Sequence, residues 1–233
     1  MKIITKAVLA YLMTAIAGSV STYSAWGDFS NTNPSGVWKY GSVAIDGAVG
    51  ALDVSFTSMP TFQLNCASGG GFQADCWQSS AFIAKPNGSF GTGTVSYVTD
   101  YLNLHPSSAG DMSVLAFTAP MADVFTFLGE WADHDIVGGG GVEVWTALGD
   151  GTILAHNTMP AVSGPIAINF SQSLAAGQSV YFVLGFAREW TYDSTGLKLD
   201  VSDSGTASPE PGSMLLVGLG AAAVWLKRRA YAR

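Results

Sequence analysis

The stretch Val180-Tyr181-Phe182-Val183-Leu184-Gly185-Phe186 decides the fold class of this chain. Side chains alternate across an extended strand, so its first, third, fifth and seventh residues, all large and apolar, share one face. Tyr181, Val183 and Gly185 share the other face. This period of two predicts a β-strand.

Similar runs recur along the chain, and most of them end at a turn signal such as Pro60, Pro120 or Asp150-Gly151. No convincing amphipathic helix separates them. The expected strands are 37–41, 51–56, 113–117, 123–131, 142–147, 166–170, 180–186 and 197–202. Many short strands without helices predict an all-β domain over residues 25–202, an antiparallel β-sandwich of jelly-roll type.

The charges are distributed unevenly. The chain has 233 residues with 10 basic and 17 acidic side chains, and six of the basic residues lie in the terminal segments. The middle, about 185 residues, suits one domain and is strongly acidic. This sign disfavours nucleic acid and anionic lipid as partners, because both need clustered Lys and Arg.

The N-terminus has the pattern of a secretory signal peptide over residues 1–24, which would direct export through the Sec translocon. Lys2 and Lys6 form its charged start, and an apolar run over 7–17 precedes small residues. Two cleavage sites fit the small-residue rule, one after Ser21 and one after Ser24; cleavage after Ala25 would place a bulky residue at −3. An uncleaved anchor is the alternative, although the run is short for a membrane span.

The C-terminus combines three features after a small-residue linker at 203–208. These are the triplet Pro209-Glu210-Pro211, an uncharged apolar run at 212–226, and the basic cluster Lys227, Arg228 and Arg229. A helix over the run would reach only about 22 Å, short of a hydrocarbon core of roughly 30 Å, so it would depend on snorkelling flanks. The basic cluster predicts a membrane stop with a cytoplasmic C-terminus. Composition alone also fits an ordinary membrane anchor.

With this order of triplet, apolar run and basic stop, residues 209–233 resemble the PEP-CTERM sorting signal of Gram-negative bacteria. The resemblance implies a transient anchor in the inner membrane, which the transpeptidase exosortase recognises and removes. It also implies a cell that makes extracellular polysaccharide. It says nothing about the activity of the exported domain.

A second resemblance concerns the middle of the chain. Trp38-Lys39-Tyr40-Gly41, Leu104-His105-Pro106 and Tyr192-Asp193-Ser194-Thr195-Gly196-Leu197 stand in an order similar to that of a β-sandwich module found in bacterial surface proteins and alongside carbohydrate-active enzymes. Its motifs are short and rich in turn residues, and no functional residue is carried over from it.

Cys66 and Cys76 are the only cysteines. In an exported protein such a pair most simply forms one disulfide, here closing a Gly-rich loop. A metal or redox site is the alternative, but the spacing is not C-x-x-C and the loop contains no His.

The sequence contains no nucleophile elbow and no zinc-protease motif, and its tetraglycine 138–141 does not join a strand to a helix. His105, His134 and His156 form no recognisable metal pattern. Glu130 and Glu143 could be a carboxylate pair of a glycan-acting hydrolase, but sequence cannot give their separation. We expect no enzyme activity.

Two weaker sites remain as hypotheses. Glu130, Asp133 and Asp135 could supply oxygen ligands to Ca²⁺, although a solvated acidic turn is the simpler interpretation, and no other cofactor is expected. Trp145 and Trp131 are candidate glycan contacts, because flat aromatic faces stack on sugar rings; packing inside the protein is the alternative.

The sequence therefore predicts an exported, exosortase-sorted, non-catalytic protein of the cell surface or extracellular matrix, associated with exopolysaccharide or biofilm. A carbohydrate-binding module and a glycan-acting hydrolase are the alternatives.

Overall fold

The computed structural model describes residues 19–44, 55–66, 73–135 and 137–205. Their strands build the compact unit Val20–Ser204. The described residues contain no helix, and so none that could cross a membrane. The predicted membrane helix at 212–226 and most of the predicted signal peptide lie outside the described residues.

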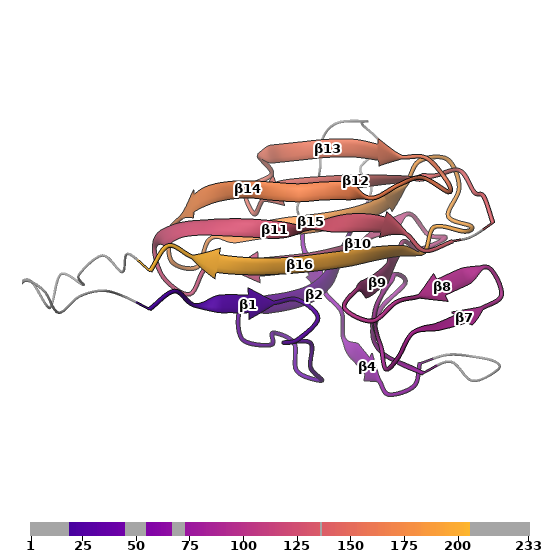
Figure 1. Cartoon of the computed structure of the whole chain (residues 1–233), viewed down its shortest axis with the longest axis horizontal. Helices are drawn as coiled ribbons and strands as arrows, with labels where there is room; N and C mark the ends of the chain where they lie inside the picture. The colour runs from indigo at the N-terminus through magenta and orange to yellow at the C-terminus, as the bar shows by residue number, and fades with distance from the viewer. Residues whose placement is uncertain (1–18, 45–54, 67–72, 136, 206–233) are drawn as a thin grey trace, which may run out of the picture. The chain divides into compact units, whose positions relative to one another are not determined.

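Two antiparallel sheets and one small hairpin make up the unit (Figure 1). The first sheet contains, in spatial order, β14 (Ile166–Leu174), β11 (Asp123–Asp133), β16 (Thr195–Asp203), β9 (Leu102–His105), β6 (Phe82–Pro86), β5 (Ala74–Gln78) and β4 (Thr61–Gln63), with β1 (Thr22–Ser24) also paired to β16. The second contains β13 (Ile153–Met159), β12 (Val142–Leu148), β15 (Ser179–Phe186), β10 (Asp111–Thr118), β2 (Trp38–Ala44) and β3 (Thr57–Ser58). The hairpin is β7 (Phe90–Thr92) with β8 (Val95–Tyr97).

Strands β9 to β16 follow a jelly-roll path. Four of them lie in the order β14-β11-β16-β9 in the first sheet, and four in the order β13-β12-β15-β10 in the second. The chain crosses from one sheet to the other at every connection except the β12–β13 hairpin. This is the eight-strand arrangement of two Greek keys. It confirms the predicted fold class.

The core lies between the two sheets and is rich in aromatic rings. Phe117 of β10 is at its centre, with ring centroids 5.2 Å from Phe125 and 5.5 Å from Phe127, both on β11, and 5.5 Å from Trp38 of β2. Edge-on and tilted packing of this kind adds favourable quadrupole contacts to the burial of apolar area. The alternation read from the sequence at 123–131 and 180–186 therefore faces this core on one side.

The second sheet also buries apolar side chains on its outer face. This outer cluster consists of Val43, Met112, Val114, Trp145 and Val183, with Phe56 and Tyr181 packed against it. It accounts for the strands of this sheet that are apolar on both faces, such as β15.

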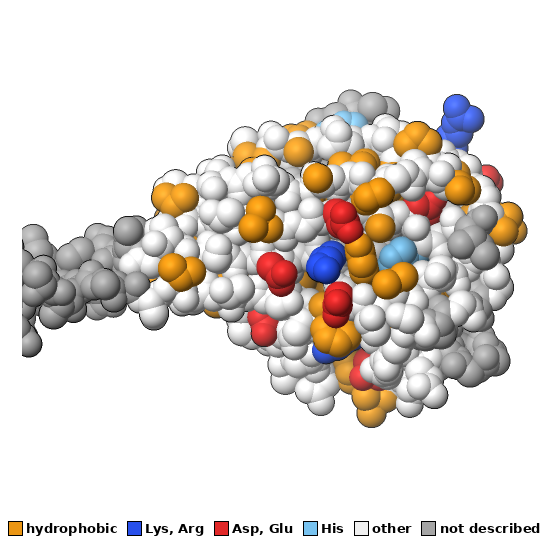
Figure 2. Space-filling view, viewed as in Figure 1, with side chains coloured by type: hydrophobic (Ala, Val, Ile, Leu, Met, Phe, Trp, Pro, Cys, Tyr) orange, Lys and Arg blue, Asp and Glu red, His pale blue; other side chains and the backbone are white. Residues whose placement is uncertain are grey.

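The outer face of the first sheet is polar by comparison. Glu130 lies directly opposite Lys198, and Leu128 opposite Asp200, on β11 and β16. Figure 2 shows acidic and basic side chains beside one another over the middle of this face. The Tyr101 hydroxyl donates a hydrogen bond to Glu130, and the Lys198 amine lies 6.0 Å from the centre of the Tyr101 ring.

The hairpin predicted at Asp150-Gly151 is present, with Gly151 at φ +91° and the Leu148 amide bonded to the Thr152 carbonyl at 2.8 Å.

The strand predicted over 51–56 is wrong where it can be examined. Residues 51–54 lie outside the described part, while Ser55 and Phe56 are in no strand. Phe56 instead stacks on Tyr181 at 5.6 Å, and pairing begins at β3.

The first and last strands of the folded unit, β1 and β16, lie side by side. The Ser21 amide donates to the Asp203 carboxylate at 2.8 Å, and the Asp203 amide donates to the Ser21 carbonyl at 3.1 Å. β1 then pairs with β16 over residues 22–24. The boundary predicted after residue 24 therefore falls inside the folded unit, and Asp203, assigned to the linker, is the last residue of β16.

Candidate functional site

The connection between β15 and β16, residues 187–194, carries the most distinctive surface side chains of the described chain. Trp190 is 47% exposed and Tyr192 is 44% exposed. Among the described large hydrophobic side chains that are exposed, these two are the aromatic ones. We name residues 187–194 the aromatic loop.

Neighbouring backbone supports the aromatic loop from beneath. The Ala187 amide donates to the Gly141 carbonyl at 3.1 Å. A Cβ added to Gly139 would lie 2.9 Å from the Thr191 carbonyl oxygen, so glycine allows the 137–141 connection to approach this closely. Tyr192 adopts φ +65°, a backbone conformation that is costly for a residue with a side chain and is often found at functional positions.

The ring of Trp190 has a partner within the first sheet. It meets His105 edge-on, with the centroids 6.3 Å apart and the planes at 72°. His105 in turn stacks on Phe82 at 5.3 Å. Burial lowers the pKa of His105, so the ring is neutral and packs as an aromatic group.

A buried polar layer lies at the base of the loop. Asp135 accepts hydrogen bonds from the Ser194 amide and from the Thr94 hydroxyl, both at 2.8 Å. The His134 amide donates to the Ser194 carbonyl at 3.0 Å, and its Nδ1 lies 3.2 Å from the Asn103 side-chain nitrogen. Burial lowers the pKa of His134 to about 4, which keeps this histidine neutral.

Asp193 belongs to the same layer and is unusual. It is 1% exposed, and neither carboxylate oxygen has a hydrogen-bond partner within the described chain. Burial, followed by the nearby charges of Asp135, Glu189 and Asp133, raises its pKa to about 7. The base of the aromatic loop therefore holds a buried carboxyl group whose ionisation costs free energy.

The structure does not bring Glu130, Asp133 and Asp135, the residues of the Ca²⁺ hypothesis, together as one ligand group. Glu130 accepts from the Tyr101 hydroxyl on the outer sheet face, while Asp133 accepts from the backbone amides of Asp135 and Val162. Asp135 accepts from the Thr94 hydroxyl and the Ser194 amide, one hydrogen bond at each oxygen. Within the described residues no group of three or more acidic, His or Cys side chains is placed to hold a metal ion.

Neither tryptophan chosen from the sequence is an exposed platform. Trp131 is 2% exposed and packs in the core, since it follows the inward alternation of Phe125 and Phe127. Trp145 belongs to the outer cluster and points away from the core, but it is only 9% exposed. His156 stacks on its ring at 4.8 Å with nearly parallel planes.

Glu130 and Glu143 cannot form a hydrolase pair, because they lie on the outer faces of different sheets. Glu143 Oε2 accepts a hydrogen bond from His156 Nε2 at 3.2 Å, beside Trp145. A glycosidase needs both carboxyl groups at one cleft.

A groove of about 340 Å³ opens between the edge strands β13 and β14, one from each sheet. Trp131, Val144 and Ile168 line it with apolar surface, and Asn157, Asn169 and Gln172 add polar groups.

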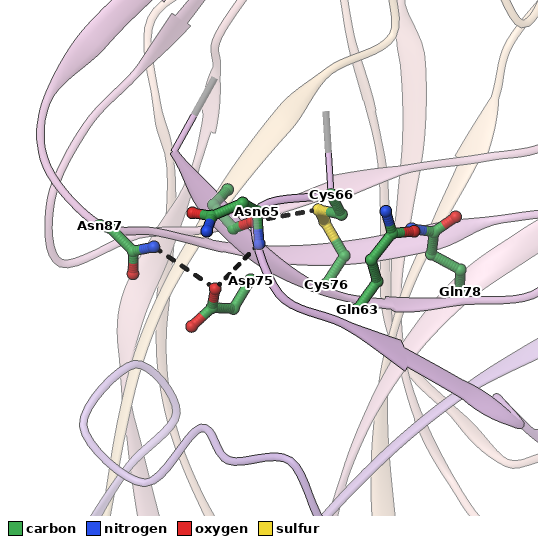
Figure 3. Close-up of a disulfide and its surroundings, with 8 residues drawn as sticks. Gln63, Asn65, Cys66, Asp75, Cys76, Gln78 and Asn87 are labelled. Atoms are coloured by element: carbon green, nitrogen blue, oxygen red, sulfur yellow. Dashed lines mark hydrogen bonds between the residues drawn. A yellow bond between two sulfur atoms is a disulfide. The ribbon is translucent and has the colours of Figure 1, made fainter. Parts of the chain in front are cut away.

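Cys66 and Cys76 form a disulfide, with their Cα atoms 5.7 Å apart (Figure 3). Asp75 lies beside it and accepts from the Asn65 amide at 3.3 Å and from the Asn87 side chain at 3.4 Å. The bridge thus joins the middle of β5 to a residue shortly after β4. It has a structural role in this position.

Sequence reasoning missed the aromatic loop as a site. Trp190 and Tyr192 follow Arg188 and Glu189 outside any alternating run, which was the available signal that they lie in a connection rather than on a strand face. Nothing in the sequence pattern distinguishes Asp193 from the exposed acids.

The tail of the chain matches a known sequence motif. Residues 209–229 match the PEP-CTERM protein-sorting motif. This motif implies an exported, membrane-anchored precursor with exosortase as its processing partner. No curated protein matches the chain.

The solved structures that it resembles are distant. A family 35 carbohydrate-binding module from an environmental isolate is 16% identical, with a TM-score of 0.29, over 70% of this chain and 93% of that one. The Stig cyclase FisC from Fischerella sp. TAU is 9% identical, with a TM-score of 0.37, over 78% and 98%. The CBM51-2 and INT domains of Clostridium perfringens ZmpB, solved with GlcNAc, are 12% identical, with a TM-score of 0.35, over 46% of this chain. This chain spans only 22% of that ZmpB chain. Scores this low assign neither a family nor a ligand.

Proposed function

We propose that this chain is an exosortase-sorted, non-catalytic protein of the cell surface or extracellular matrix that associates with exopolysaccharide. The observation that carries the proposal is the PEP-CTERM motif at residues 209–229. It begins only a few residues after β16, the strand that ends the sandwich at Asp203. Removal of the tail would therefore leave the sandwich whole.

The proposal includes an N-terminal signal peptide that is removed at or before Ser21. Cleavage after Ser24 or Ala25 would delete β1 and expose the edge of β16 with which it pairs. Cleavage at any of these sites removes Ser21, the partner of Asp203, so only the fate of β1 separates them. Of the sites that fit the small-residue rule, the one after Ser21 leaves the strand intact.

The test is fractionation of the host with and without its exosortase. We expect the protein in the extracellular fraction only when exosortase is present, and in the membrane fraction with its full tail when it is absent. Replacing Pro209 and Pro211 together by alanine should reproduce the second result, whereas Ser208→Ala, next to the triplet, should not. Equal release from both strains would refute the sorting function.

Carbohydrate binding is the second candidate function. The exposed rings of Trp190 and Tyr192 favour it, because flat aromatic faces on a supported loop suit contact with sugar rings.

A further inference from the structure

The aromatic loop offers two flat rings in a largely preformed arrangement. Trp190 rests edge-on against His105, and Tyr192 is held two residues later in its positive-φ conformation. Hydrogen bonds fix both ends of the loop, at Ala187 and at Ser194. A preformed surface loses little conformational entropy when it binds a ligand.

The surroundings of the two rings indicate what they would bind. Arg188 and Glu189 are exposed directly before Trp190 and can donate to and accept from hydroxyl groups. The 137–141 connection adjoins the loop, since a Cβ added to Gly139 would lie 3.1 Å from the Tyr192 Cβ. Aromatic rings flanked by both donors and acceptors suit a ligand with apolar faces and many hydroxyl edges, which describes a sugar ring.

The acidic charge of the domain favours a neutral sugar over an anionic one as the ligand. Lys39, Lys85, Arg188 and Lys198 are the only basic residues between the terminal segments of a chain with 17 acids. Lys39, Lys85 and Lys198 lie on strands β2, β6 and β16, so Arg188 is the basic side chain of the loop. A polyanionic glycan would meet general repulsion there.

We propose that Trp190 and Tyr192 stack on the rings of a neutral polysaccharide, with Arg188 and Glu189 bonding to its hydroxyl groups. This inference rests on the proposed association with exopolysaccharide and names the site and ligand class for it. It assigns binding to the loop end of the sandwich, not to Trp145 or to the groove between β13 and β14.

The experiment is affinity electrophoresis of the full chain in mild detergent, through gels containing galactomannan, xyloglucan, mixed-linkage β-glucan or, as an anionic probe, alginate. We expect at least one neutral polysaccharide to retard the protein and alginate not to. Trp190→Ala and Tyr192→Ala should each weaken the apparent affinity by about tenfold or more, as for other central aromatic contacts. Trp190→Phe should retain more affinity than Trp190→Leu, because only the former keeps a flat ring.

Met121→Ala is the matched control. Met121 is exposed on the β10–β11 connection, which lies at the opposite end of the sandwich because Thr118 pairs with Ser179 at the start of β15. The control should bind like the unaltered chain, and thermal melting should show that every variant is folded.

Three results would overturn the inference: no retardation by any neutral polysaccharide, equal retardation of the Trp190→Ala variant, or Trp190→Leu binding as well as Trp190→Phe. The last would indicate an apolar contact without stacking, as for a protein partner. Because the assay uses the unprocessed chain, its failure is distinguishable from failure of exosortase-dependent release.

Discussion

Replacing Asp193 by asparagine should stabilise the protein at alkaline pH and should have a smaller effect in acid. The carboxyl group is buried without a hydrogen-bond partner in the described chain, and burial raises its pKa from the ordinary 3.8 to about 7. Between these values the folded protein holds a proton that the unfolded chain has released. Stability therefore falls as pH rises through this window and stays low above pH 7.

The magnitude follows from the shift. One pKa unit corresponds to about 1.4 kcal/mol, so the full cost of ionised Asp193 is about 4 kcal/mol, and the part that appears between pH 5 and pH 8 is about 3 kcal/mol. Asp193→Asn keeps the shape and removes the titration. The free energy of unfolding of this variant, relative to the unaltered protein, should therefore rise by about 3 kcal/mol between these two pH values.

The assay is urea unfolding of both proteins at pH 5 and pH 8, with and without EDTA. Taking the difference between the proteins at each pH cancels the titration of other groups, His134 among them. Parallel pH profiles for the two proteins would refute the reasoning. Loss of stability in Asp193→Asn at pH 8, together with a destabilising effect of EDTA on the unaltered protein, would show that a cation compensates the carboxylate instead.

Three further predictions concern the fold. Replacing Cys66 and Cys76 together by serine should lower the free energy of unfolding by about 3 kcal/mol, the chain-entropy value for a loop of this length. Reduction of the disulfide should cause the same loss. An unchanged urea midpoint would contradict the structural role of the bridge. Gly129→Ala should lower the free energy of unfolding by about 1–3 kcal/mol or prevent folding, because the new methyl group would overlap the Lys198 carbonyl of β16. A melting curve like that of the unaltered protein would count against the β11–β16 register. The folded pKa of His134, about 4, lies below its unfolded value of 6.5, so the protein loses stability as pH falls and this ring must be protonated. His134→Gln should therefore reduce the fall in unfolding free energy between pH 7.5 and pH 5 by about 2 kcal/mol. An unchanged pH profile of stability would show that this ring is not the buried neutral group.

The main strands of the sandwich could be predicted from the sequence because they are long and alternate strictly. At 123–131 and 180–186 the inward residues, such as Phe127 and Phe182, are large and apolar, and the pattern alone fixes which face meets the core. The same parity places Trp131 inside with Phe127, so its burial could have been expected.

The short strands could not be predicted in the same way. β7 and β8 lie in a Gly- and Ser-rich stretch and pair with each other as a short hairpin. β9 forms because distant strands pair with it, as β16 does along Leu102 and Leu104. β1 directly follows an apolar run that has the pattern of a signal peptide, so the local sequence does not indicate that it pairs with β16. Tertiary pairing determines such segments more than their own composition does.

The candidate site was harder still to predict, since it depends on exposure. Trp145 and Trp190 are the same residue type, and the sequence does not tell them apart. His156 and the other residues of the outer cluster cover Trp145, whereas the aromatic loop leaves Trp190 exposed. Sequence patterns report which side of a strand a residue occupies, and they do not report whether another segment covers that side.

Mapping both ends of the released protein by mass spectrometry would test the central proposal most directly. An N-terminus at or before Thr22 and a C-terminus after Asp203 but before the apolar run at 212–226, seen only in cells with exosortase, is the predicted result. It would mean that the sandwich is exported whole and its sorting tail removed. A released protein that keeps residues 212–233, or one that begins at Ala25 or later, would contradict it.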